Sequence, residues 1–185
     1  MSNEKQTQAD EHATEVESRH PIESRAIKVS MVLPPDTNHH GTMFGGRLMA
    51  YIDDVATISA ARHARRAVVT ASTDSVDFIR PVRLGNTVCL ESFVTFAGRT
   101  SMEVFVKVTT EELLTGKREV TTTAFLTFVA LDEQNRPTAV PRIVPQSSME
   151  KQLYESAATR MAHRQQRRTE QTQIIGSLGT GFPWE

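Results

Sequence analysis

The chain has 185 residues, a length that fits one domain with tails or two very small domains. Its 21 lysines and arginines nearly balance its 22 aspartates and glutamates, so the net charge of −1 gives no reason to expect nucleic acid or a membrane surface as a partner. Cys89 is the only cysteine, which excludes an internal disulfide framework and a cysteine-rich metal site.

The N-terminal segment, residues 1–22, is acidic and almost free of large apolar side chains, so we expect a disordered tail. It has no apolar stretch of the kind that a secretory signal needs, and no run in the chain approaches the roughly 20 apolar residues of a membrane span. We therefore expect a cytoplasmic protein without a membrane span. We divide the remainder into one domain over 23–148, a helix over 149–169 and a flexible tail over 170–185, where Phe182 and Trp184 could dock on a partner.

The first part of the domain predicts a strand, a loop and a buried helix. Residues 26–33 read as a strand that Pro34 and Pro35 end, and a polar loop with glycines follows. Over 47–64, apolar residues recur at helical spacing and small residues fill most other positions. A helix that is apolar or small on nearly every side is surrounded by other elements, so we expect it at the centre of the domain.

After residue 66 the hydrophobic period changes to two, which is typical of strands. The predicted strands, separated by short turns, are 68–79, 87–96, 102–109 and 120–131. We predict an α+β fold in which a curved antiparallel sheet of about five to six strands wraps around one central helix, with a C-terminal helix added. Such a sheet leaves an open edge, and a second copy of the chain can pair with that edge. We therefore expect at least a dimer.

Four segments carry a resemblance to a known family: PPDTNHHGTMFGGRLMAYIDD, VTASTDSVDFIRPVRLGNTV, GRTSMEVFVKV and FLTFVALDEQNRPTAVPRIVP. Over about residues 25–160 the chain resembles the hot-dog-fold acyl-CoA thioesterases, specifically the bacterial single-hot-dog type related to brain acyl-CoA hydrolase. The resemblance implies hydrolysis of fatty acyl-CoA to a free fatty acid and CoA, at active sites shared across a dimer interface, in a trimer of dimers. Thr42 departs from the family pattern, where relatives often have Asn or Asp, and Asp54 places a second carboxylate beside Asp53.

We expect Asn38, Gly46 and Asp53 to be catalytic. A thioester carbonyl needs a base for water, a group that places the water and donors for the oxyanion; the first N–H groups of a helix, after a Gly-Gly pair, can serve as such donors. Asp53, the expected general base, lies about 10 Å along the helix from Gly46, too far for one side chain to reach back. In an antiparallel dimer the partner's copy can face the helix start, which agrees with the resemblance: Asn38 of one protomer facing Asp53 of another.

Other roles for these residues stay open at this point. Asp53 could be a buried structural carboxylate, and we expect it to lie among apolar neighbours. It could also attack the carbonyl directly and form an anhydride. Asn38 could simply close an Asx turn in its loop.

The sequence gives no reason to expect a metal or a cofactor other than the CoA moiety of the substrate. His39 and His40 are adjacent on a loop without a third ligand nearby, which makes a poor metal site. No serine lies in a Gly-x-Ser-x-Gly motif, so a Ser-His-Asp hydrolase is not predicted. Cys89 alternates with core residues in a predicted strand and is interpreted as structural.

Acyl-CoA carries a 3′-phosphate and a diphosphate, which need cations and N–H donors. The candidates for binding it are Gly45, Arg65, Arg66, Arg80, Arg99, Thr100 and Ser101. Each arginine could instead be an ordinary solvated surface charge. The pantetheine arm is expected along a strand edge near 70–72.

Two other functions fit the same fold. One is a non-catalytic protein that binds or senses acyl-CoA, and the other is an enoyl-CoA hydratase that pairs an aspartate with His39 or His40. The Asn, Gly-Gly and Asp pattern favours the thioesterase.

Overall fold

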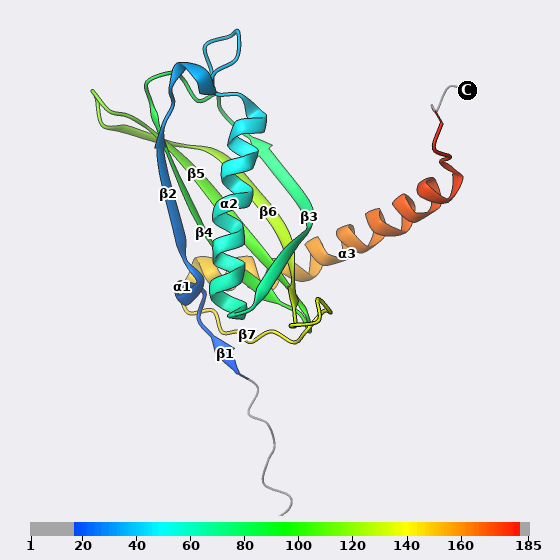
Figure 1. Cartoon of the computed structure of the whole chain (residues 1–185). Helices are drawn as coiled ribbons and strands as arrows, with labels where there is room; N and C mark the ends of the chain where they lie inside the picture. Colours follow the sequence, from blue (N-terminus) through cyan, green and yellow to red (C-terminus); the bar gives the residue numbers. More distant parts are fainter. Residues whose placement is uncertain (1–16, 182–185) are drawn as a thin grey trace, which may run out of the picture.

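The computed structural model describes residues 17–181 and consists of one curved sheet wrapped around one helix (Figure 1). The sheet is antiparallel and has the strand order β2-β4-β5-β6-β3. Its strands are β2 (Ala26–Met31), β3 (Ala67–Phe78), β4 (Thr87–Ala97), β5 (Ser101–Glu112) and β6 (Lys117–Leu131). The central helix is α2 (Gly45–Ala64). The predicted hot-dog architecture is confirmed.

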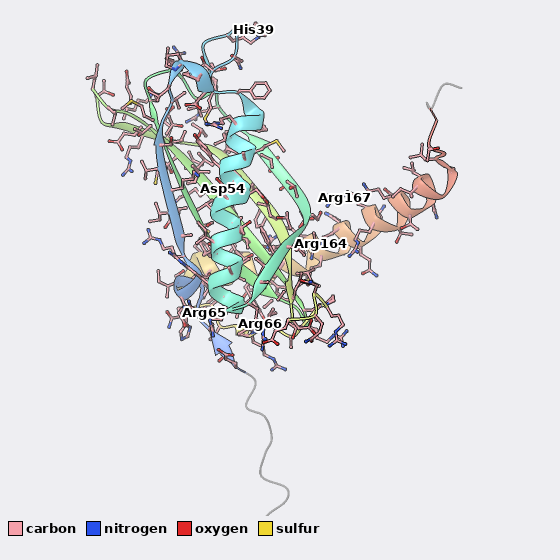
Figure 2. The ribbon with its side chains drawn as sticks, in the orientation of Figure 1. His39, Asp54, Arg65, Arg66, Arg164 and Arg167 are labelled. Atoms are coloured by element: carbon pink, nitrogen blue, oxygen red, sulfur yellow. The ribbon has the colours of Figure 1, made fainter. Side chains whose placement is uncertain are left out.

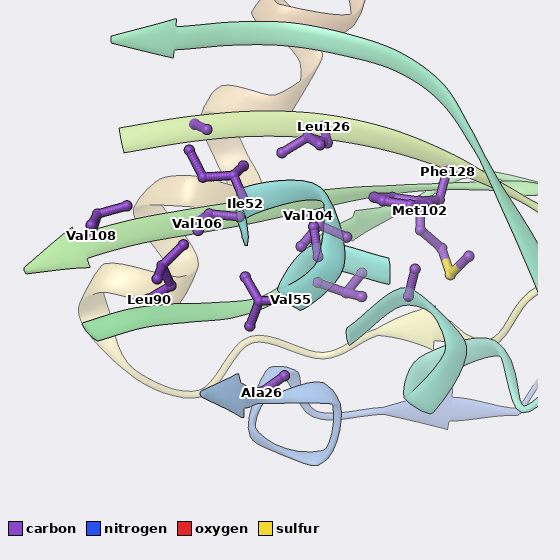
Figure 3. Packing of buried hydrophobic residues seen from close by; sticks show 14 of the residues in the cluster. Ala26, Ile52, Val55, Leu90, Met102, Val104, Val106, Val108, Leu126 and Phe128 are labelled. Carbon is purple, nitrogen blue, oxygen red and sulfur yellow. The ribbon is translucent and has the colours of Figure 1, made fainter. Parts of the chain in front are cut away.

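The core lies between α2 and the concave face of the sheet. Because strand side chains alternate between faces, Val104 and Val106 of β5 point inward and are fully buried. They meet Ile52 and Val55 of α2, together with apolar side chains of β4 and β6 (Figure 3). The burial of these apolar side chains holds α2 against the concave face of the sheet.

Strand β3 forms one edge of the sheet and pairs with β6, not with β4, which follows it in the chain. The register runs from Ala67 opposite Leu131 to Phe78 opposite Thr122, with irregularities between Thr70 and Ser72 and between Thr73 and Ser75. The other long side of this 12-residue strand has no partner among the described residues. A long open edge is a site for pairing with another chain.

The N-terminal part is ordered earlier than expected. Strand β1 (Ser18–Arg19) pairs in parallel with β7 (Arg142–Ile143), and helix α1 (Pro21–Ser24) follows it. The disordered tail predicted for 1–22 therefore does not extend over residues 18–22; its first 16 residues lie outside the described part of the chain. A short 3-10 helix, η1 (Pro34–Asp36), begins the loop before α2.

Helix α3 (Ser148–Ser177) is longer than the predicted helix over 149–169 and continues into the segment expected to be a flexible tail. It begins with a capping box in which Ser147 accepts a hydrogen bond from the Glu150 N–H and Glu150 accepts from the Ser147 N–H. The helix crosses the outer face of the sheet, opposite α2, and runs out past β3 (Figure 1). Phe182 and Trp184 lie beyond the described residues.

No helix within residues 17–181 is both long enough and apolar enough to cross a bilayer.

Candidate active site

Helix α2 begins with free backbone donors. The first N–H groups of a helix have no intrahelical partner, and Phe44 at the N-cap provides no side-chain cap for those of Gly45 and Gly46. A Cβ on Gly46 would come within 2.7 Å of the Phe44 ring, so a larger residue there would have to displace that ring. A cavity of about 310 Å³ lies beside this helix start, lined by residues that include Gly45, Phe78 and Arg80. The positive end of the helix therefore opens onto a space that a ligand can enter.

The loop before α2 is fixed by Asp36 and Arg47. The buried Asp36 carboxylate accepts hydrogen bonds from Arg47 Nε at 3.0 Å and from the Leu33 N–H at 3.1 Å. These contacts tie the loop to the first turn of the helix. The hydrogen bond to Asp36 raises the pKa of the Arg47 guanidinium, so this cation stays charged at every working pH.

Asp53 lies on the side of α2 that faces the open edge strand β3. Thr70 Oγ1 of β3 donates a hydrogen bond to Asp53 Oδ1 at 2.9 Å. This bond leaves the other carboxylate oxygen available and orients the group. Asp53 is exposed in the single subunit, which does not surround it with the apolar neighbours that we expected from the sequence. The role of Thr70 as its partner has no signal in the sequence, because the two residues are 17 positions apart in different elements.

Asp54 faces the opposite direction. Its carboxylate forms an ion pair with Lys28 of β2 at 2.9 Å, and the Lys28 ammonium lies 4.6 Å from the centre of the Tyr51 ring. Figure 2 labels Asp54 on α2. The two neighbouring carboxylates thus contact opposite edges of the sheet: Asp53 contacts β3, and Asp54 contacts β2.

Asn38 closes its own loop. Its Oδ1 accepts hydrogen bonds from the N–H groups of His40 at 2.9 Å and of Thr42 at 3.3 Å, and its Nδ2 donates to Thr42 Oγ1 at 3.1 Å. The Asx-type turn considered from the sequence is therefore present. Because an amide nitrogen carries two hydrogens, one remains for a water or a carbonyl. The rings of His39 and His40 lie next to each other at the exposed tip of the loop, with centroids 3.8 Å apart and planes tilted by 45° (Figure 2).

The predicted CoA-binding residues fall at the two ends of the molecule. Arg80 lies near the start of α2, where it pairs with Glu119 at 3.4 Å. Arg65 ends α2 in a left-handed conformation with φ 52°, and Arg66 follows it (Figure 2). A 20-residue helix spans about 30 Å, and that length separates these two arginines from the start of α2.

The turn between β4 and β5 lies at the same end as Arg65. Its backbone is closed by a bond from the Gly98 N–H to the Ser101 carbonyl, and the Thr100 carbonyl accepts from the Ala130 N–H. Arg99 is exposed and, like Arg65 and Arg66, forms no ion pair with any residue between 17 and 181. One subunit therefore holds Asn38, Gly45, Gly46 and Arg80 at one end, three unpaired arginines at the other, and Asp53 between them.

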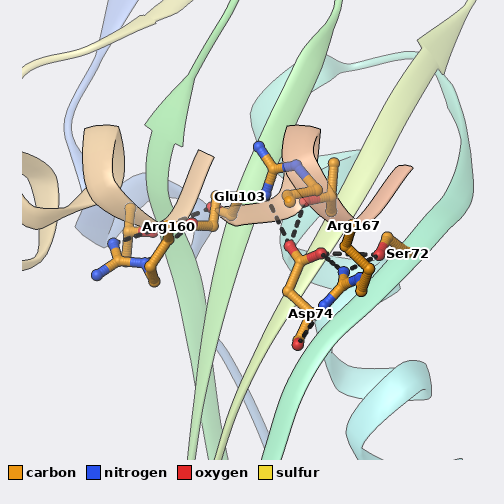
Figure 4. Close-up of polar contacts among 8 residues, drawn as sticks. Ser72, Asp74, Glu103, Arg160 and Arg167 are labelled. Carbon is orange, nitrogen blue, oxygen red and sulfur yellow. Dashed lines mark hydrogen bonds and ion pairs between the residues drawn. The ribbon is translucent and has the colours of Figure 1, made fainter. Parts of the chain in front are cut away.

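Asp74 of β3 forms a polar cluster on the outer face that the sequence did not indicate. Its carboxylate accepts hydrogen bonds at 2.7 Å from Ser72, Thr127 and Arg164, and Arg167 pairs with it at 2.8 Å (Figure 4). Burial opposes ionisation of this carboxyl, but the hydrogen bonds outweigh burial and hold its pKa below the usual value. The cluster joins α3 to the strand that carries Thr70.

Comparison with known proteins finds similarity to thioesterases. Residues 40–117 match the thioesterase superfamily. An uncharacterized acyl-CoA thioester hydrolase of Bacillus subtilis, YkhA, is 53% identical over 168 residues, which cover 91% of this chain and 98% of that protein.

Two solved structures are similar over nearly their whole length. An acyl-CoA hydrolase from Staphylococcus aureus, solved with butyryl-CoA, CoA and CoA disulfide, is 43% identical with a TM-score of 0.83, over 86% of this chain and 98% of that one. An acyl-CoA thioesterase solved as an apo-hexamer is 52% identical with a TM-score of 0.81, over 83% and 98%. The S. aureus enzyme was also solved with an aspartate, an asparagine or a threonine replaced by alanine.

Proposed function

This chain belongs to the thioesterase superfamily and is an acyl-CoA thioester hydrolase, and from that premise we propose that each active site is completed by a second copy of the chain. One observation carries the proposal: Asp53 and the free N–H groups of Gly45 and Gly46 lie on one side of one helix, yet about 10 Å apart along its axis. No single thioester can contact both within one subunit.

Pairing of two β3 edges resolves this separation. A two-fold axis between antiparallel β3 strands sets two α2 helices antiparallel as well, so Asp53 of one subunit faces the start of α2 in the other. The same operation brings Arg65, Arg66 and Arg99 of one subunit toward the end of the partner that holds Asn38. The apolar side chains exposed beside this edge support the arrangement: Phe44, Met49, Val69 and Phe78.

The chemistry at such a site is hydrolysis assisted by a general base. The Asp53 carboxylate takes a proton from a water whose oxygen attacks the thioester carbonyl carbon. The Gly46 N–H, at the positive end of α2, stabilises the oxyanion of the tetrahedral intermediate. When the C–S bond breaks, the CoA thiolate takes the proton back from Asp53, and the free fatty acid leaves. Asn38 donates its remaining N–H to the water or to the carbonyl.

The substrate is held by charge at one end and by apolar surface at the other. Arg65, Arg66 and Arg99 bind the phosphates of CoA, with Thr100 and Ser101 beside them, and the pantetheine arm follows the β3 edge past Thr70. Gly45 and Arg80 line the cavity at the start of α2, where the acyl carbonyl arrives. Three residue types at this proposed site, Asp53, Asn38 and Thr70, are those altered in the S. aureus variants.

The dimers assemble further into a trimer of dimers, as the hexameric relative supports. Because a carboxylate, an amide and backbone donors supply all the steps above, the reaction needs no metal and no cofactor beyond its substrate. We place the enzyme in the cytoplasm, where a protein with one cysteine and a CoA substrate is expected to work.

Mixing two inactive variants tests the shared site. Asp53→Ala and Asn38→Ala are each expected to release little free thiol from acyl-CoA. In a heterodimer of the two, one site carries both substitutions and the other carries neither. After unfolding and refolding together, the mixture is expected to regain about a quarter of wild-type activity, since half the dimers are mixed and each has one intact site. If each single variant were active by itself, or if the refolded mixture were no more active than the two variants, the site would not combine Asn38 of one subunit with Asp53 of the other.

A further inference from the structure

Beyond Arg167, helix α3 forms no hydrogen bond or ion pair with another element within residues 17–181. From Arg168 to Ser177 every residue is exposed. A helical segment of about ten residues without such contacts is only marginally stable in water. The segment nevertheless ends with apolar side chains: Ile174, Ile175 and Leu178 are 56%, 64% and 54% exposed. These features indicate that another surface covers the end of α3.

The first half of α3 determines where that end points. Arg160 bonds to the buried Glu103 of β5, and Arg164 and Arg167 bond to Asp74 of the edge strand β3 (Figure 4). The helix then leaves the sheet past β3 (Figure 1). Ten residues beyond Arg167 add about 15 Å at 1.5 Å per residue, which equals the width of about three strands. If the sheet of a second subunit pairs with the β3 edge, the end of α3 lies over the outer face of that second sheet.

A groove runs along the same helix. It has a volume of about 760 Å³ and lies between α3 and the sheet, with Ala71, Phe96 and Val129 on the sheet side. On the helix side it is lined at alternating spacings of three and four by Ala158, Met161, Gln165, Arg168 and Thr172. Residues at these spacings form one stripe on a helix. The next position of the stripe is Ile175.

We propose that residues 172–178 of one subunit dock in this groove of its dimer partner, so that two α3 helices pack antiparallel across the outer face of the joined sheets. The proposal rests on the β3-paired dimer of the preceding section. The occupant is a second copy of this chain because the edge that the helix crosses is the edge at which the second copy pairs.

The positions along β3 fit this arrangement. Asp74, where α3 crosses, lies about 5 Å from the midpoint of the strand. A two-fold axis at that midpoint sets the two helices about 10 Å apart, close to the 8–10 Å at which helices pack. The groove includes Ala71, on the other side of the midpoint, so it lies on the flank of α3 that the partner helix approaches.

The stripe on α3 is arranged for an antiparallel contact. With the axis near Arg168, Met161 of one helix lies opposite Ile175 of the other, and Gln165 lies opposite Thr172. The contact therefore has two apolar ends and a polar centre, from which the long Arg168 side chain can reach solvent.

An engineered disulfide tests the contact directly. In a Cys89→Ser background, the pair Met161→Cys and Ile175→Cys places two thiols about 21 Å apart along one helix, too far for a bond within a chain. Across the proposed contact they face each other. Oxidation is expected to give a covalent dimer on a non-reducing gel, and no larger product, because a two-fold contact closes on itself. No covalent product, or a ladder of three or more chains, would overturn the proposal.

A control cysteine pair and a single variant test whether the crosslink is specific to the proposed contact between the two α3 helices. Leu114→Cys with Ile175→Cys is expected to give no crosslink between positions 114 and 175, because Leu114 lies in the hairpin between β5 and β6 and not on the face of α3 that meets the partner helix. Ile175→Asp is expected to raise the dimer dissociation constant at least about tenfold, measured by sedimentation. An unchanged constant would count against docking.

Thiol release measured on the same samples separates this proposal from the shared active site. An active dimer that does not crosslink refutes the docking of α3 and leaves the shared site standing. An inactive monomer refutes both.

Discussion

At the scale of single residues, the two adjacent carboxylates on α2 have separate tasks. Asp53 is held by Thr70 on the open edge of the sheet, whereas Asp54 is held by Lys28 on the opposite edge. A replacement of Asp53 by alanine removes the proposed base and is expected to lower kcat about 100-fold or more, with little change in KM. Steady-state thiol release from short, medium and long acyl-CoAs measures this.

Asp54→Ala is the matched control, because it changes the same charge at the neighbouring position. It is expected to stay within about threefold of wild-type kcat, since the Asp54 carboxylate is paired with Lys28 of β2 and is not part of the proposed site. If Asp54→Ala were the inactive variant, the roles of the two residues would have to be exchanged.

In the proposed mechanism, Thr70 acts on the reaction through its hydrogen bond to Asp53. Thr70→Val keeps the shape of the side chain but removes the donor to Asp53 Oδ1, and we expect kcat to fall about tenfold while KM stays near the wild-type value. Thr70→Ser restores a hydroxyl and is expected to recover most of the activity. A valine variant with full kcat, or a serine variant as impaired as valine, would argue against orientation by hydrogen bonding.

The sequence could indicate some of these residues and not others. Asn38, Gly46 and Asp53 stand in a compact pattern of about 16 positions, which a family resemblance can detect. Thr70 and Lys28 come from separate strands, and only the folded sheet brings them to the helix. The single subunit leaves Asp53 exposed because the apolar neighbours of α2 surround its other side.

At the scale of elements, the hydrophobic period predicted where the central helix and the four later strands lie, since each buries one face or stripe. It could not predict that β3 pairs with β6, because strands that are consecutive in the chain, as β3 and β4 are, usually but not always lie side by side in a sheet. It also ended the last helix too early. Residues 170–177 have little apolar content, and the helix is anchored by arginine contacts earlier in its length.

The contact between α3 and β3 depends on Asp74. Asp74→Asn leaves Arg164 and Arg167 without their carboxylate, and since this site is largely buried we expect the free energy of unfolding to fall by about 3 kcal/mol at neutral pH. Chemical denaturation at a series of pH values measures this loss.

The pH dependence identifies the charge as the cause. Because folding lowers the pKa of Asp74, the unfolded chain binds its proton more readily, so the stabilisation is complete above the unfolded pKa of about 4 and is lost as the pH falls through the lower folded value. The difference between wild type and Asp74→Asn should therefore shrink below about pH 4. A difference that stays constant down to pH 2 would assign the loss to packing instead.

At the scale of the whole molecule, the proposed site takes the direction of its substrate from Arg65, Arg66 and Arg99, which form no ion pair within residues 17–181. Arg99→Ala is expected to raise KM about fivefold for every acyl chain length and to leave kcat unchanged, since the arginine meets phosphate far from the thioester. Added salt should reduce the difference in KM between Arg99→Ala and wild type, because it screens the exposed contact between Arg99 and phosphate. Steady-state kinetics at two ionic strengths test both points. A fall in kcat with unchanged KM would contradict this role.

The pairing of β3 with β6 has a consequence for how the enzyme is made. The strand that carries Thr70 leaves the ribosome about 45 residues before the start of the strand it pairs with, so for that interval both of its sides are unpaired. Contacts so distant in the chain form slowly. Newly made subunits therefore acquire the hydrogen bond from Thr70 to Asp53 and the β3 edge of the proposed dimer in one late event. A nascent chain that meets another before residue 131 is synthesised risks pairing the wrong strands.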